Sequence, residues 1–115
     1  MKVLITLCIF LSVMTLSAQS SITGIWDTGK ENTKIQITEV EGVMNATIYS
    51  SDNSKLEIGA PFLKEVMKDG DEWKGKLYSF KKRKWFQVTI TEREEELQAK
   101  VKAGAMKKKL KWTRV

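Results

Sequence analysis

The sequence contains no histidine, one cysteine and one proline among its 115 residues. Without histidine, and with its cysteine (Cys8) close to the start, the chain cannot assemble a Ser–His or Cys–His nucleophile pair. The nitrogen and sulfur ligands that zinc prefers are missing for the same reason, and no glycine-rich loop of the phosphate-binding kind is present. We therefore expect no enzyme activity, no metal and no cofactor. Catalysis by carboxylates alone is the alternative left open.

The first residues have the layout of a secretory signal peptide. Lys2 supplies a positive start, residues 3–16 form a mostly apolar run, and Ser17-Ala18-Gln19 gives small residues followed by a polar break. The run is shorter than the roughly 20 residues that a membrane-spanning helix needs. We predict a signal peptide over residues 1–18, one domain over residues 19–115, and export to the periplasm or secretion.

Cleavage after Ala18 would leave a domain with neither a thiol nor a disulfide. About 97 residues would remain, with 19 lysines and arginines once Lys2 is removed, against 14 acidic residues. A domain of this size buries a modest fraction of its surface. Much of its stability must therefore come from large side chains, and the four tryptophans can each bury on the order of 200 Å².

Short segments with alternating apolar and polar residues make up the rest of the chain. Residues 97–103 alternate strictly, as a strand with one buried face should. Clear turn signals separate the segments, among them Glu41-Gly42 and Asp69-Gly70-Asp71. No apolar run has the period of a long helix. We predict eight strands, at residues 22–26, 34–39, 43–49, 62–67, 72–80, 85–91, 97–103 and 110–115.

Local features of the sequence lead to further predictions. Pro61 stands where a strand can begin, a position that proline tolerates, and Gly75 inside a strand indicates a bend or a close approach of another backbone. Residues 92–96 are expected to form an acidic turn. Residues 104–109, with three consecutive lysines, are expected to form a second turn before the last strand.

Eight short strands joined by turns need protection for their edges. Closure into an up-and-down barrel removes the edges, and eight strands enclose an interior that side chains fill or that holds one small ligand. We therefore predict an all-β fold, an eight-stranded antiparallel up-and-down barrel. Whether it is filled stays open, because Trp26, Trp73 and Phe86 are large inward residues whereas Ala99 and Ala103 are small.

Two groups of motifs resemble known families. Gly24-x-Trp26 in the first strand, with Arg114 in the last, resembles the signature of the lipocalin-like (calycin) superfamily. There the tryptophan closes one barrel end and the arginine packs over it, which implies a cation–π contact between Arg114 and Trp26. Residues 62–64, residues 69–78 and the ending Trp112-Thr113-Arg114-Val115 resemble an exported bacterial family, domain of unknown function 2147, with a lipocalin-like fold. That family has no established activity.

The chain departs from the pattern of that family in two places. The link between Tyr49 and Ile58 is shorter than the usual proline-rich insertion. Residues 79–84 lack the aspartate-proline and the glycine of the typical turn. A function that the insertion carries elsewhere in the family would be absent here.

Charge is divided unequally between the turns. Successive connections of an up-and-down barrel alternate between its two ends, so the first, third, fifth and seventh share one end. These four hold nine basic and three acidic residues, whereas the other three hold two basic and nine acidic residues. We predict a basic barrel mouth, and an acidic end at which Trp26 and the chain ends lie. The residues predicted for the mouth are Lys81, Lys82, Arg83, Lys84, Trp85, Lys107, Lys108 and Lys109.

A basic mouth would attract anions, and two functions follow. The first is a binding module for a small amphipathic or anionic ligand, such as a fatty acid or lipid, with its tail inside the barrel. The alternative is an envelope-associated interaction protein that docks on an anionic membrane surface through the basic end and binds no small molecule. A third interpretation is that the lysines only keep the loops soluble. Export argues against nucleic acid as a partner, and we expect a monomer.

Overall fold

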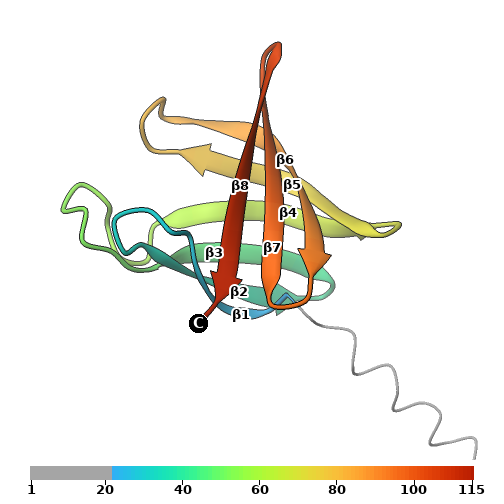
Figure 1. The fold of residues 1–115 in the computed structure, drawn as a ribbon, viewed down its shortest axis with the longest axis horizontal. Helices are drawn as coiled ribbons and strands as arrows, with labels where there is room; N and C mark the ends of the chain where they lie inside the picture. The colour runs from blue at the N-terminus through green and yellow to red at the C-terminus, as the bar shows by residue number, and fades with distance from the viewer. Residues whose placement is uncertain (1–21) are drawn as a thin grey trace, which may run out of the picture.

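The computed structural model describes residues 22–115, so the predicted signal peptide lies outside the described residues. These residues form a closed barrel of eight antiparallel strands, each paired with its neighbours in sequence (Figure 1). The predicted eight-stranded up-and-down barrel is confirmed. The strands are β1 (Gly24–Asp27), β2 (Lys34–Val40), β3 (Val43–Ser50), β4 (Pro61–Asp69), β5 (Glu72–Ser79), β6 (Lys84–Arg93), β7 (Glu96–Ala103) and β8 (Met106–Arg114).

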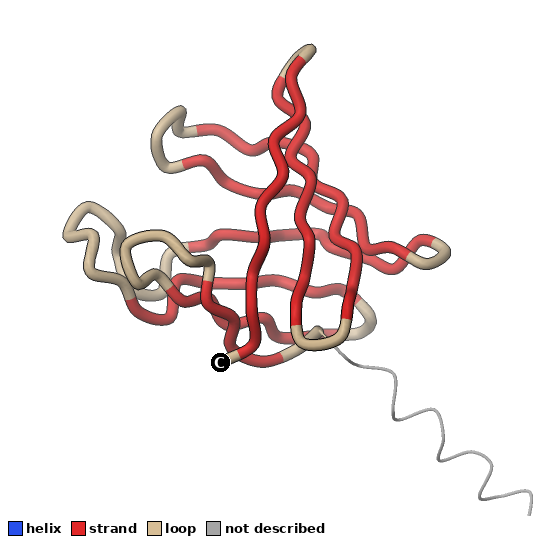
Figure 2. Tube along the Cα trace, viewed as in Figure 1, coloured by secondary structure: helices blue, strands red, loops and turns tan. Residues whose placement is uncertain are grey.

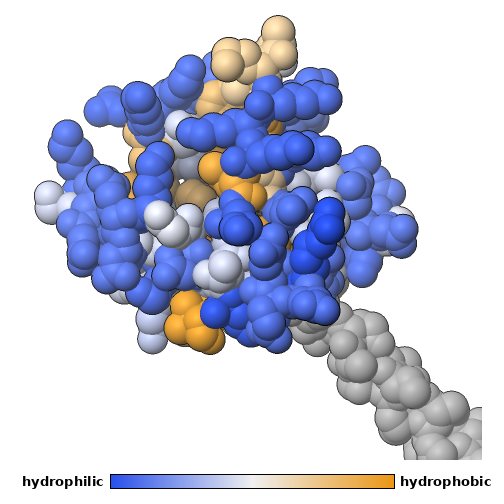
Figure 3. Space-filling model, in the orientation of Figure 1, coloured by the Kyte–Doolittle hydropathy of each residue, from blue (hydrophilic) through white to orange (hydrophobic). Residues whose placement is uncertain are grey.

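Strands and the turns between them account for residues 22–115 (Figure 2). No helix in this part of the chain is long and apolar enough to cross a membrane. The core follows the two-residue period of the strands: in β7, Leu97, Ala99 and Val101 are buried, whereas Gln98 and Lys100 between them are exposed. Successive side chains of a strand thus point alternately into the barrel and onto a largely hydrophilic surface (Figure 3).

Tight turns fix the pairing of neighbouring strands. Glu41 and Gly42, between β2 and β3, have φ angles of 50° and 83°. Two positive φ angles in a two-residue hairpin turn match the right-handed twist of the flanking strands. Between β7 and β8, Gly104 has a φ of 68° and Ala103 pairs with Met106. This last turn contains only two residues.

Gly75 lies opposite an irregularity in β4. The register of β4 and β5 shifts between Lys64 and Met67, and Glu65 in that interval has a φ of 53°. A Cβ atom on Gly75 would lie 2.5 Å from Val66 Cγ2 and 2.6 Å from Val66 Cα. The bulge therefore brings the backbone of β4 into the space that a side chain would need. The predicted close approach at Gly75 is confirmed, and β4 begins at Pro61 as expected.

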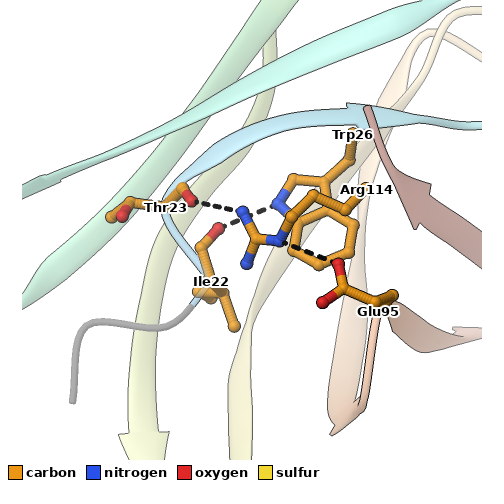
Figure 4. A network of polar contacts seen from close by, with 5 residues as sticks. All are labelled: Ile22, Thr23, Trp26, Glu95 and Arg114. Carbon is orange, nitrogen blue, oxygen red and sulfur yellow. Dashed lines mark hydrogen bonds and ion pairs between the residues drawn. The ribbon is translucent and has the colours of Figure 1, made fainter. Parts of the chain in front are cut away.

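The barrel closes where β1 meets β8. Trp26 pairs with Arg114 and Asp27 pairs with Thr113, so the backbone ladder is only two residue pairs long. The Arg114 guanidinium lies over the indole, with Cζ 4.3 Å from the ring centroid (Figure 4). The cation–π contact implied by the resemblance to the lipocalin-like superfamily is present.

Hydrogen bonds hold both partners of this contact. Arg114 Nη1 donates to the Thr23 carbonyl at 3.1 Å, and Trp26 Nε1 donates to the Ile22 carbonyl at 3.0 Å (Figure 4). A Cβ atom on Gly24 would lie 2.9 Å from Arg114 Nη1. Glycine at this position thus leaves room for the guanidinium to reach the segment that precedes β1.

Two predicted turns were too long. The turn predicted at residues 104–109 contains only Gly104 and Ala105, because β8 begins at Met106. The acidic turn predicted at residues 92–96 contains only Glu94 and Glu95. The start of β8 was not predicted, because the three lysines at residues 107–109 lack the apolar alternation that marks a half-buried strand.

The closure contact can be tested by a double-mutant cycle. Trp26→Ala is expected to lower the free energy of unfolding by about 3–5 kcal/mol, as truncation of a buried aromatic side chain does. Arg114→Ala is expected to lower it by about 1–2 kcal/mol through lost stacking and lost aliphatic packing. Because the residues touch, the double variant should lose less than the sum of the two, measured by urea denaturation. Additive losses would contradict the contact.

The crowding at Gly75 predicts that Gly75→Ala destabilises the barrel by about 1–3 kcal/mol, the usual cost of overpacking. The nearest obstacles include Val66 Cα and the Glu65 carbonyl oxygen as well as the Val66 side chain. Adding Val66→Ala should therefore fail to restore stability. Recovery of the parent melting temperature in that double variant would show that the side chain alone causes the crowding.

Candidate functional site

A cavity of about 420 Å³ opens at the barrel end that carries the β1–β2, β3–β4, β5–β6 and β7–β8 connections. Its floor is apolar. Trp112 is buried there, with the Phe62 ring 5.7 Å away between centroids, and Phe80 stacks on Phe62 at 6.3 Å. The other apolar lining residues are Ile48, Leu56, Leu77, Phe86, Val101, Ala103 and Leu110.

The opposite half of the barrel is filled by side chains. Trp26, Ile35, Ile37, Ile90 and Leu97 are each no more than 1% exposed, and none of them lines the cavity. The sequence left open whether side chains fill the barrel or leave it hollow, and this barrel combines the two. One end is solid, and the end with the four longer or projecting connections is hollow.

The rim of the cavity is basic. Lys30, Lys81, Lys82 and Lys108 line it, against a single carboxylate, Glu31. The lysines come from three separate elements: the β1–β2 loop, the β5–β6 turn and strand β8. Positive charge converging on an apolar cavity raises the local concentration of anions at the mouth.

One side of the rim is held in place by contacts between two loops. Asn53 Nδ2 donates to Glu31 Oε1 at 2.8 Å, and the Asp52 backbone N–H donates to the Glu31 carbonyl at 3.0 Å. The hydroxyls of Thr33 and Ser51 share a hydrogen bond of 2.6 Å. These bonds tie the β1–β2 loop to the β3–β4 loop and hold this side of the mouth in place.

The wall is incomplete beside β8. Strand β1 pairs with β8 only near the closed end, and the β1–β2 loop then curves away from it (Figure 1). The cavity is lined on one side of this gap by Thr28 and Lys30, and on the other by Lys108 and Leu110.

Some of the residues predicted for the mouth lie together at the cavity. Lys81, Lys82 and Lys108 line it. Lys84 is exposed at the start of β6, with Nζ 5.4 Å from the centroid of the Phe86 ring, and does not line the cavity. Arg83 occupies the β5–β6 turn with a φ of 55° and does not line the cavity.

The other predicted residues lie on the outside of the barrel. Trp85 packs edge-on against Tyr78, with 5.2 Å between ring centroids, and Lys64 Nζ lies 4.3 Å from the Trp85 ring. Lys107 and Lys109 flank the inward-facing Lys108 on β8 and so point to the outer wall. The predicted grouping of all three lysines in a turn was wrong, because strand alternation separates them.

Sequence analysis did not assign Phe62, Leu77 or Phe80 to the cavity. Inward positions are apolar in both the filled and the hollow half, so the pattern does not mark where filling stops. Register shifts between β3 and β4 also let Phe62 line the cavity while the adjacent Leu63 is buried in the core. Within residues 22–115, no three His, Cys, Asp or Glu side chains are grouped to hold a metal ion.

Comparison with known proteins supports the fold. No protein-family model matches the chain, and no curated protein sequence matches it. The resemblance to family 2147 therefore stays a prediction. Among solved structures, protein HP1028 from the human pathogen Helicobacter pylori, which belongs to the lipocalin family, matches with a TM-score of 0.67. The match has 23% sequence identity and covers 83% of each chain. By this likeness, the fold of the chain is that of a lipocalin-like, closed eight-stranded barrel.

Proposed function

We propose that the protein is an exported, non-enzymatic binding module for one small amphipathic anion, such as a fatty acid or a similar lipid. The observation that carries this proposal is the cavity of about 420 Å³, with its apolar floor and lysine rim. Its volume falls within the roughly 300–1,000 Å³ typical of small-molecule sites. Membership of family 2147 and export to the periplasm or beyond belong to the same proposal, supported by the quoted motifs and the signal-peptide layout.

The floor suits an apolar tail. Phe62, Phe80 and Trp112 present aromatic surface, and each methylene removed from water there contributes about 0.8 kcal/mol. Burial of the tail therefore supplies most of the affinity. Burial of an apolar tail has little chemical specificity. The cavity therefore limits the length of the tail but does not select the head group.

The rim suits an anionic head group. Lys81 and Lys82 approach the mouth from the β5–β6 turn and Lys108 from β8. A carboxylate among them would accept charge-assisted hydrogen bonds, which solvent weakens because all three lysines are exposed. The Glu31 carboxylate already accepts the Asn53 amide N–H, which directs one of its oxygens toward the β3–β4 loop.

Cavity occupancy can be measured by displacement of the fluorescent fatty acid cis-parinarate with laurate, using the exported protein. Laurate should displace the probe, and Leu110→Trp should lose most of the binding, because the indole fills space that Leu110 now lines. The melting temperature of the variant serves as the control for folding.

Native mass spectrometry of protein purified from its own envelope should show an adduct that organic extraction removes. Only the bare chain mass, with no displacement by laurate, would contradict the proposal.

The head-group contact predicts a difference between two neighbouring lysines. Lys108→Glu should weaken laurate binding about tenfold or more, since a loss of about 1.4 kcal/mol corresponds to a factor of ten. Lys107→Glu makes the same change in net charge on the outer face of the same strand and should leave the affinity near that of the parent. Dodecanol, which lacks the charge, should bind both variants alike. Equal weakening by both substitutions would show that net charge, and not the rim, selects the ligand.

A further inference from the structure

The outer face of the β7–β8 hairpin sets lysines directly opposite one another. Lys100 pairs with Lys109, and Lys102 pairs with Lys107. All four are exposed, and no carboxylate among the described residues forms an ion pair with any of them. Like charges opposite each other destabilise an antiparallel pair. The hairpin therefore carries a repulsion that a bound anion would relieve.

The rows of lysines continue across the neighbouring strands. Lys102 pairs with Gln87, which pairs with Lys76, which in turn pairs with Lys64. Lys100 pairs with Thr89, and Thr89 pairs with Lys74. We call this face the lysine wall; it consists of Lys64, Lys74, Lys76, Lys100, Lys102, Lys107 and Lys109.

Two ion pairs reach the lysine wall from its edge. Lys74 lies 3.3 Å from Asp69 and Lys76 lies 3.8 Å from Glu65. These side chains are 48–64% exposed, so solvent weakens both pairs. The half of the wall on the β7–β8 hairpin keeps its full positive charge.

The tip of the same hairpin is apolar. Ala103, Gly104, Ala105 and Met106 carry no charge, and Met106 is 74% exposed. The hairpin projects beyond the rest of the barrel (Figures 1 and 2), and its tip shows apolar surface (Figure 3). An exposed apolar tip next to a basic face is the arrangement by which amphipathic segments bind the interface of anionic membranes.

We propose that the β7–β8 hairpin docks the barrel onto an anionic lipid surface. Residues 103–106 enter the head-group region, while Lys100, Lys102, Lys107 and Lys109 contact the lipid phosphates. The apolar tip selects this partner, because a soluble polyanion would neutralise the lysines and leave Met106 in water. Docking does not require an occupied cavity, but it would bring the mouth, to which Ala103 and Lys108 belong, to the lipid surface.

The experiment is co-sedimentation of the exported protein with phosphatidylcholine vesicles that contain or lack phosphatidylglycerol, at low and at physiological salt. The parent should bind only the phosphatidylglycerol vesicles, and more weakly at the higher salt, where the screening length is about 8 Å. Lys107→Glu/Lys109→Glu should lower this binding more than tenfold. The same variant places Glu opposite Lys102 and Lys100, so its melting temperature should rise, which separates lost docking from lost folding.

Matched variants identify the surface. Lys34→Glu/Lys55→Glu makes the same change in net charge on β2 and the β3–β4 loop and should retain vesicle binding. Equal loss in this variant would show that net charge alone matters and would overturn the proposal. So would loss in Lys81→Glu/Lys82→Glu with retention in the wall variant, because docking would then lie at the mouth.

A variant of the hairpin tip distinguishes a lipid surface from a soluble polyanion as the partner. Met106→Ser keeps the charge and should weaken vesicle binding several-fold, yet leave binding of soluble polyphosphate unchanged. If Met106→Ser binds vesicles as the parent does while the wall variant loses polyphosphate, the face serves a soluble polyanion and the lipid proposal fails. A parent protein that binds no phosphatidylglycerol vesicles overturns it outright. Laurate displacement is measured without vesicles, so this result is separate from the test of the cavity.

Discussion

The contact between Arg114 and Trp26 lies at the seam where β1 and β8 close the barrel. The β1–β8 ladder contains only two residue pairs, so backbone hydrogen bonds alone tie the seam weakly. The guanidinium over the indole, with its bond to Thr23 and a 3.7 Å contact from Nε to Glu95, adds side-chain contacts across the same seam. It also links the β6–β7 turn to both ends of the chain. Strands β1 and β8 rely on this closure for a second neighbour, whereas β2 to β7 each have two neighbours without it.

Closure at one end also explains why the interior differs along the barrel axis. Near the seam, Trp26 and Leu97 pack into a solid core. Toward the mouth, β8 continues without a strand partner on its β1 side, and the hairpins spread apart (Figure 1). Inward side chains there have fewer neighbours across the barrel, which leaves the space between Phe62, Leu77 and Val101.

Strand β8 connects the two proposed binding surfaces. Its alternation sends Lys108 to the cavity rim and Lys107 and Lys109 to the lysine wall. A single basic run thus contributes to the proposed small-molecule site on one face and to the proposed lipid-binding surface on the other. The two roles can be separated by substitution of adjacent residues, because the period of a strand is two.

The sequence by itself determined the number of strands, the barrel, the pairing of its two ends and the close approach at Gly75, because these depend on local alternation, turn residues and the need to protect strand edges. It also placed Lys81 and Lys82 at the mouth. It misjudged the lysines of residues 107–109, since a strand that lacks an apolar face there looks like a turn. Only the tertiary structure decided that the barrel is hollow at one end and that Lys100 and Lys102 face Lys109 and Lys107. Both depend on cross-strand register and on how far the walls spread, which arise from contacts between residues distant in the chain.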